Sequence, residues 1–118
     1  MCIINTDMEK IVQILKAAGD ENRFRILMML LIRPLCVCEI LEILEIKGGT
    51  LSAHLKLLRN AGLINQKKEG RWVIYSLAGE KVEKYLRQIE KEIADSSLLT
   101  GDAEKISRIC AASCSRVH

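Results

Sequence analysis

The spacing of apolar residues changes in the middle of the chain, and this change restricts the folds that the chain can adopt. From Thr50 to Asn60 the leucines recur every three or four residues, which predicts a helix, and Gly62 is placed to end it. From 63 to 68 and from 71 to 77, apolar and polar residues alternate instead, with Glu69-Gly70 between the two runs. Such alternation around a glycine-containing pair predicts a β-hairpin. A hairpin directly after a short helix is expected to form a wing.

The segments before this helix complete a helix-turn-helix. Helical spacing predicts three earlier helices: Met8–Ala18, a second from the cap residue Asp20 up to Pro34, and a third from Pro34 through Leu44. Gly48 and Gly49 then supply a tight turn before the helix at 50–60, as a DNA-reading helix pair requires. The predicted fold class is mainly α with a small β-hairpin, a winged helix-turn-helix.

The chain after the hairpin returns to helical spacing. A long amphipathic helix is predicted at Glu80–Ala94, and its apolar face needs a partner surface, so we expect it to pair with its symmetry mate in a homodimer. A break follows at Ser96-Ser97, and a shorter helical pattern runs from 102 to 114. We therefore expect a DNA-binding and dimerisation domain at 1–95 and a C-terminal tail at 96–118, whose short helix carries Cys110 and Cys114.

The positive charge of the chain is concentrated in one segment. Across 118 residues the net charge is only +3, but the segment from Lys47 to Arg71 holds six basic residues and one acidic residue. This distribution is typical of a nucleic-acid contact, although charge alone also fits a solvated face. The longest apolar run, 26–32, is far shorter than the roughly 20 residues that span a bilayer, and Met1–Lys10 lacks the pattern of a signal peptide. We expect a cytoplasmic protein with no membrane partner.

The cysteines offer soft ligands. In a cytoplasmic chain, five cysteines favour metal binding, redox sensing or burial over disulfides. Thiolates select soft ions. If Cys36 and Cys38 lie in the first turn of the third helix, they point about 200° apart, so chelation must unwind that turn. The same position, at the positive end of a helix dipole, predicts a lowered thiol pKa.

Several runs of residues resemble one known family. The matching segments are DENRFRIL at 20–27, LCVCEI at 35–40, LSAHLKLL at 51–58, GLI at 62–64 and EGRWVIY at 69–75. They resemble the ArsR/SmtB family of metal-sensing transcriptional repressors, and the run around Cys36 and Cys38 is similar to the arsenic site of its arsenite-responsive branch. The resemblance implies a dimeric repressor of a metalloid-resistance operon that releases DNA when As(III) or Sb(III) binds.

The third thiolate of such a site is not fixed by the resemblance. Arsenite-responsive members often carry a third cysteine at the position that Leu41 occupies here. Cys110 and Cys114 are four residues apart in a helical pattern and share a face, so both are candidates. Burial of Cys110 is the alternative interpretation, and Cys2, near the N-terminus, is a weaker candidate.

The residues expected to contact DNA lie on the 50–60 helix and the hairpin. The helical wheel directs four of them at the major groove: Thr50, Ser52, Ala53 and Lys56. Phosphate contacts are expected from Lys47, Lys56, Lys67, Lys68 and Arg71. His54 is interpreted mainly as a packing residue, while the family motif leaves a backbone contact open. A dimer that places two such helices about 34 Å apart predicts double-stranded operator DNA with an imperfect palindrome.

Two other functions use the same cysteines. Cys36 and Cys38, or a pair formed with the tail, would serve a thiol redox or persulfide sensor of the same fold. A thiol oxidoreductase is disfavoured, because such enzymes typically place Cys-x-x-Cys in a βαβ setting, and neither the spacing nor the setting is present. We expect a protein that is not an enzyme and has no organic cofactor.

Overall fold

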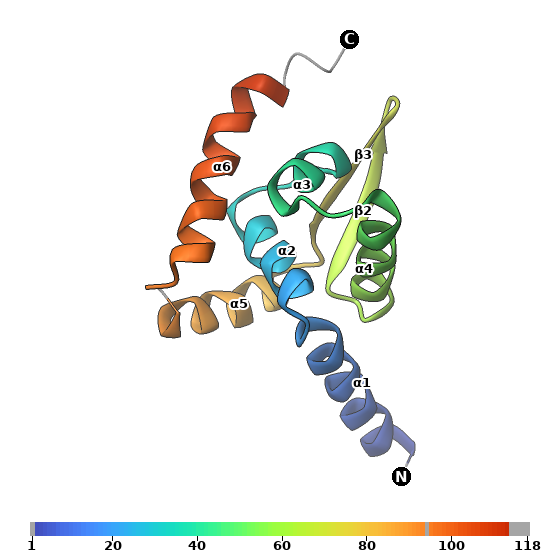
Figure 1. Cartoon of the computed structure of the whole chain (residues 1–118). Helices are drawn as coiled ribbons and strands as arrows, with labels where there is room; N and C mark the ends of the chain where they lie inside the picture. The colour runs from blue at the N-terminus through green and yellow to red at the C-terminus, as the bar shows by residue number, and fades with distance from the viewer. Residues whose placement is uncertain (1, 94, 114–118) are drawn as a thin grey trace.

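The computed structural model describes residues 2–93 and 95–113, with the side chains of residues 8–93 and 95–109. Figure 1 shows a helical molecule with one small sheet. The elements are α1 (Cys2–Ala18), α2 (Glu21–Ile32), β1 (Leu35–Cys36), α3 (Val37–Leu44), α4 (Gly48–Asn60), β2 (Ile64–Glu69), β3 (Trp72–Leu77), α5 (Glu80–Glu92) and α6 (Ser97–Ser113). The predicted fold class, a mainly helical winged helix-turn-helix, is confirmed.

Helix α2 forms the centre of the core. Asp20 caps it as predicted, because its Oδ2 accepts a hydrogen bond from the backbone N–H of Arg23 at 3.1 Å. The run from 26 to 31 is buried on every face of the helix. Helix α2 is surrounded by five other elements, which are α1, α4, α5, α6 and β3. Because these elements cover all of its faces, α2 can carry apolar residues on every side.

The sheet has three antiparallel strands in the order β1-β3-β2, one more than the predicted hairpin. The additional strand is β1, in which Leu35 pairs with Tyr75 and Cys36 with Ile74. The expectation that Pro34 begins a helix is therefore wrong. A residue before proline is pushed toward extended geometry, and Arg33 has φ −170° and ψ 164°, so the chain enters β1 extended.

Three helices begin earlier than their sequence patterns predict. Helix α4 starts at Gly48, where the N–H of Leu51 bonds the carbonyl of Lys47 at 3.0 Å, rather than at Thr50. Helix α1 starts at Cys2 instead of Met8. Helix α6 starts at Ser97 instead of at 102, because the Oγ of Ser96 accepts from the N–H of Leu99 at 3.3 Å and caps it. The predicted end signal of α4 is confirmed, since Gly62 has φ +78°.

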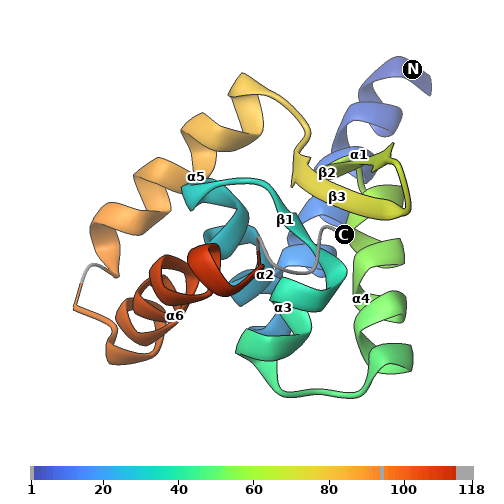
Figure 2. The same ribbon diagram turned by 90° about the horizontal axis from the view of Figure 1, so that it is seen from above.

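Helix α6 packs on the domain over α2 and α3, and Figure 2 shows it beside both. Asp102 forms a two-bond ion pair with Arg25 of α2, at 2.8 and 3.0 Å. Farther along, Lys105 reaches the carbonyl of Ile43 at 3.5 Å and the carboxylate of Glu45 at 3.6 Å. Ile106 is buried in the same contact. Residues that the sequence places in a tail therefore cover the first helix of the helix-turn-helix.

Two helices keep apolar side chains on the surface of the monomer. In Figure 1, α1 and α5 lie at the end of the molecule opposite the hairpin tip. Their exposed apolar residues, between 42% and 66% exposed, are Met8, Ile11, Val12 and Leu15 on α1, and Tyr85 and Ile89 on α5. Such a set is typical of a surface that another chain covers. No helix within the described ranges is both long and apolar enough to cross a membrane.

Candidate functional site

The sulfur atoms of Cys36 and Cys38 lie 2.9 Å apart. Cys36 is the N-cap of α3, with φ −90° and ψ 166°, and Cys38 is the second residue of the helix. The prediction that the two thiols point to opposite sides of a helix is therefore wrong, because Cys36 has the extended backbone of β1. The two sulfurs are side by side while the first turn of α3 is intact, so α3 need not unwind to bring them together.

The buried carboxylate of Glu39 holds Cys36 in this position. Cys36 and Glu39 form a capping box: the thiol faces the N–H of Glu39, and the Cys36 N–H donates to Oε1 of Glu39 at 2.9 Å. Oε2 of the same carboxylate accepts from Arg33 at 2.9 Å. The Glu39 side chain is only 4% exposed. The carboxylate thus joins the end of the α2–β1 connection to the first turn of α3.

The two thiols differ in exposure. Cys36 is 1% exposed, whereas Cys38 is exposed to solvent. The pKa of Cys36 is raised to about 11, mainly by burial, with smaller contributions from the hydrogen bond to Cys38 and the charge of Glu39, against the opposing effect of the N–H of Glu39. The expectation of a lowered thiol pKa is wrong for Cys36, since desolvation outweighs the lowering effect of the N–H of Glu39 at the start of α3.

The donor set of this pair suits a soft ion. Both donor atoms are sulfur, and neither cysteine forms a disulfide. Among the side chains that the structure describes, no group of three or more His, Cys, Asp or Glu residues is arranged to hold a metal ion. The side chains of the other predicted ligands, Cys110 and Cys114, and of Cys2, lie outside the described residues. The described pair therefore provides two sulfur donors.

The predicted groove-facing residues occupy the outer face of α4. Leu51, Leu55 and Leu58 are buried against the core. The opposite face carries Thr50, Ser52, Ala53 and Lys56, all exposed, and Lys47 is exposed at the N-cap. Helix α4 thus presents small polar and basic side chains to solvent along one side.

The hairpin carries its basic residues at and near its tip. Lys67, Lys68 and Arg71 are exposed, and Lys67 lies 3.7 Å from Glu69 in an exposed ion pair. Gln66, which the sequence did not single out, stabilises the hairpin. Gln66 Oε1 accepts from Tyr75 Oη at 2.9 Å and from Arg59 of α4, so one amide joins both strands of the hairpin to α4.

His54 faces inward instead of lying with the outer residues of α4. Its side chain is 14% exposed, and its Nδ1 lies 3.2 Å from Nη1 of Arg23. This agrees with the packing interpretation of His54. Sequence patterns did not reveal Arg23 as its partner, because the two residues are 31 positions apart.

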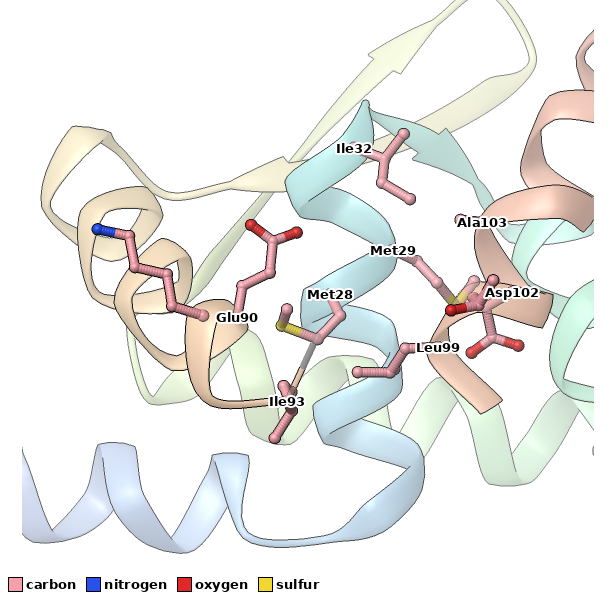
Figure 3. Close-up of a pocket in the computed structure, with 10 residues that line it drawn as sticks. Met28, Met29, Ile32, Glu90, Ile93, Leu99, Asp102 and Ala103 are labelled. Atoms are coloured by element: carbon pink, nitrogen blue, oxygen red, sulfur yellow. The ribbon is translucent and has the colours of Figure 1, made fainter. Parts of the chain in front are cut away.

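A groove of about 430 Å³ lies between α2, α5 and α6. Figure 3 shows Met28, Ile93 and Leu99 around it. Half of the residues that line it are methionine, isoleucine or leucine, and none is cysteine. The cysteine pair is therefore not part of this groove.

Comparison with known proteins places the chain among bacterial regulators. Residues 20–66 match the family described as "Bacterial regulatory protein, arsR family". The arsenical resistance operon repressor of Bacillus subtilis is 38% identical over 82 residues, which cover 69% of this chain and 78% of that protein.

Solved structures of related proteins have a similar fold. Reduced HlyU from Vibrio cholerae has a TM-score of 0.70 at 34% identity, covering 79% of this chain and 98% of HlyU. The homodimeric winged helix-turn-helix DNA-binding domain of Mb0332 from Mycobacterium bovis has a TM-score of 0.71 at 26% identity, covering 77% of this chain and 83% of that domain.

Proposed function

We propose, from the premise that the chain belongs to the ArsR/SmtB family of transcriptional regulators, that it represses a metalloid-resistance operon. In this proposal As(III) or Sb(III) binds the thiolates of Cys36 and Cys38, and the protein then leaves its operator. Family members are DNA-binding regulators rather than enzymes, in agreement with the prediction of no catalytic activity. Cys36, Cys38 and the basic surface of α4 and the hairpin carry the proposed function.

The observation that most supports this function is the 2.9 Å separation of the two sulfurs. The ion supplies bonds to soft thiolate donors, which it prefers over oxygen or nitrogen. Cys38 is exposed and offers the first point of contact, while Cys36 lies behind it in the core. The pair is thus an accessible thiol backed by a buried one.

The location of Cys36 connects the thiols to the DNA-binding surface. Its backbone pairs with Ile74 of the wing strand β3, and its side chain caps α3, the first helix of the helix-turn-helix. Binding would replace the S–H bond of Cys36 by a bond from sulfur to the ion, with the proton leaving on the displaced hydroxide. The sulfur that faces the N–H of Glu39 in the capping box would then be held by the ion, so the ligand-bound state would favour a different arrangement of β1 and α3 from the state that binds DNA.

A third thiolate is proposed to come from the C-terminal segment. Helix α6 is packed on α3 through Ile106 and Lys105, and Ile109 also packs against the core. Position 110 follows directly in the same helix. We therefore retain Cys110 and Cys114 as candidate ligands, with Cys2 as the weaker alternative.

The DNA contacts are proposed on the exposed face of α4 and on the hairpin. Thr50, Ser52, Ala53 and Lys56 would face the major groove, and the phosphate contacts would come from Lys47, Lys56, Lys67, Lys68 and Arg71. The exposed apolar residues of α1 and α5 support a homodimer, and a two-fold dimer implies an imperfect palindrome in the operator.

The experiment that tests this function is a fluorescence-anisotropy titration of the protein on its own upstream promoter DNA. Arsenite is added under reducing conditions to the wild type, to Cys36→Ser/Cys38→Ser and to Cys110→Ser/Cys114→Ser. We expect arsenite to release the wild type from DNA and to leave the Cys36→Ser/Cys38→Ser variant bound. The response of Cys110→Ser/Cys114→Ser then tests whether the third thiolate comes from these two cysteines. Salt-dependent binding that arsenite does not alter in the wild type would refute the proposed inducer but not DNA binding.

A redox or persulfide sensor is the second candidate function. The observation in its favour is the same close pair of free thiols, one of them exposed. In that case a peroxide would take two electrons from the pair and a disulfide would form. Release by peroxide together with no response to arsenite would select this function.

A further inference from the structure

Arg23 joins three helices through its guanidinium group. Its Nε donates to the carbonyl of Ala17 at 2.6 Å, and its Nη2 donates to the carbonyl of Lys16 at 3.4 Å. Both carbonyls belong to the last turn of α1, where helix carbonyls lack partners within the helix. The remaining terminal nitrogen, Nη1, lies 3.2 Å from Nδ1 of His54 in α4. A residue of α2 therefore connects the end of α1 to the recognition helix.

The contact with Arg23 specifies the protonation of His54. Arginine only donates, so Nδ1 of His54 has to accept, and the ring proton sits on Nε2. Nε2 lies 4.0 Å from Oδ2 of Asp20, the same carboxylate oxygen that caps α2 by accepting from the N–H of Arg23. Neutral His54 thus fits between a donor on one side and a carboxylate on the other.

Packing between α1 and α4 is incomplete near this link. A groove of about 400 Å³ lies between α1, α2 and α4, and its lining includes Arg23, Lys16, Leu57 and Asn60. Where side chains do not fill the space between two helices, their relative orientation depends more on the polar contacts that remain. The Arg23–His54 contact is such a contact at this junction.

We propose that His54 is a positioning residue, through which Arg23 sets the orientation of the recognition helix α4 relative to α1, and that it does not itself contact DNA. The proposal rests on DNA binding by α4 and is independent of the inducer. If α1 belongs to the dimer surface, this orientation also sets the distance between the two recognition helices of a dimer.

The surroundings of His54 determine which substitutions test the proposal. The groups that face it are the Arg23 guanidinium and the Asp20 carboxylate of the α2 N-terminus, with the Lys16 ammonium on α1 across the groove. A neutral side chain with a hydrogen-bond acceptor can replace the His54 ring beside Arg23, whereas an apolar side chain removes the acceptor that the guanidinium uses there. The first kind of variant should keep the orientation of α4, and the second should lose it.

The test measures operator affinity by anisotropy at constant salt and constant pH. Three proteins are compared with the wild type: His54→Asn, which keeps a neutral acceptor; His54→Leu, which has none; and His118→Asn, a control for the other histidine. Circular dichroism melting monitors the fold of each.

We expect His54→Asn and His118→Asn to bind operator DNA like the wild type, whereas His54→Leu should lose about ten-fold in affinity, the usual effect of losing a hydrogen bond to a charged group. A folded His54→Leu variant with wild-type affinity would overturn the proposal. A His54→Asn variant that binds clearly more weakly than the wild type would also overturn it, and this comparison holds even if His54→Leu fails to fold.

Discussion

Arg25 and Asp102 form a two-bond ion pair, with Nε–Oδ2 at 3.0 Å and Nη2–Oδ1 at 2.8 Å, between the central helix α2 and the C-terminal helix α6. Both side chains are largely buried, and the pair raises the pKa of Arg25. It attaches α6 to the domain next to α3, the helix that begins at the cysteine pair.

Replacement of Asp102 by Asn should lower the free energy of unfolding by about 3 kcal/mol, because a buried arginine then loses its counter-charge. Urea denaturation monitored by circular dichroism measures this change. The matched control is Arg25→Met/Asp102→Leu, which removes both charges and should recover most of the loss. An Asp102→Asn variant that is as stable as the wild type would show that the ion pair does not hold α6 in place.

The two thiols should react at very different rates. Cys38 is exposed, whereas burial holds the pKa of Cys36 at about 11. Alkylation with iodoacetamide at about pH 8, followed by peptide-resolved mass spectrometry, should label Cys38 and spare Cys36, since the thiolate is the reactive form. The chain unfolded in urea is the control, in which both cysteines should react alike. Equal labelling in the folded protein would contradict the described burial of Cys36.

The raised pKa of Cys36 also predicts how stability depends on pH. Between about pH 9 and about pH 11 the folded state still holds the thiol proton that the unfolded chain has lost. The contribution of Cys36 is therefore complete below pH 9 and falls as pH rises through this window, by about 1.4 kcal/mol per pH unit. Urea denaturation of the wild type and of Cys36→Ser isolates the contribution of Cys36, since only the wild type should lose stability in this way between about pH 9 and about pH 11.

The exposed apolar residues of α1 and α5 should form the dimer surface. Leu15→Glu/Ile89→Glu places charge on both helices and is expected to give a monomer with weakened operator binding, as seen in analytical ultracentrifugation. Leu98→Glu is the matched control, because Leu98 is 44% exposed but lies on α6. A double variant that remains a dimer would place the interface elsewhere.

The hairpin should contribute to DNA binding mainly through phosphate contacts. Removal of two exposed charges in Lys67→Ala/Lys68→Ala should reduce the slope of log affinity against log salt by about 2, with similar losses on specific and random DNA. Lys84→Ala, an exposed lysine on α5, serves as the control and should keep the wild-type slope. An unchanged slope in the hairpin variant would show that Lys67 and Lys68 do not contact DNA phosphates.

The features that the sequence predicted correctly depend on local chemistry. Asp20 caps α2 through a residue three positions away. The predicted hairpin also forms, although its turn is Gly70-Arg71 and not Glu69-Gly70, because Glu69 pairs with Trp72; Gly70 has φ +62°. The outward face of α4 follows from helical spacing between Thr50 and Lys56. Each of these can be inferred from residues within one or two turns of chain.

The features that the sequence did not predict depend on contacts between residues that are far apart along the chain. Strand β1 has two residues, too short for an alternating pattern, and exists because it pairs with β3 about 40 positions later. The error in placing the Cys36 thiol follows from that strand. Asp102 and its partner Arg25 are 77 positions apart, and Arg23 and His54 are 31 apart, so neither pair has a sequence signal.

The most direct test of the central claim is reciprocal coupling between the thiol ligand and DNA. Isothermal titration calorimetry measures the affinity of arsenite for the free protein and for the protein saturated with operator DNA, and anisotropy measures DNA affinity with and without arsenite. If the Cys36/Cys38 pair controls DNA binding, arsenite should bind the DNA complex more weakly than the free protein, by the same factor by which arsenite weakens DNA binding. Equal arsenite affinities in the two states would show that binding at the cysteines does not regulate DNA binding.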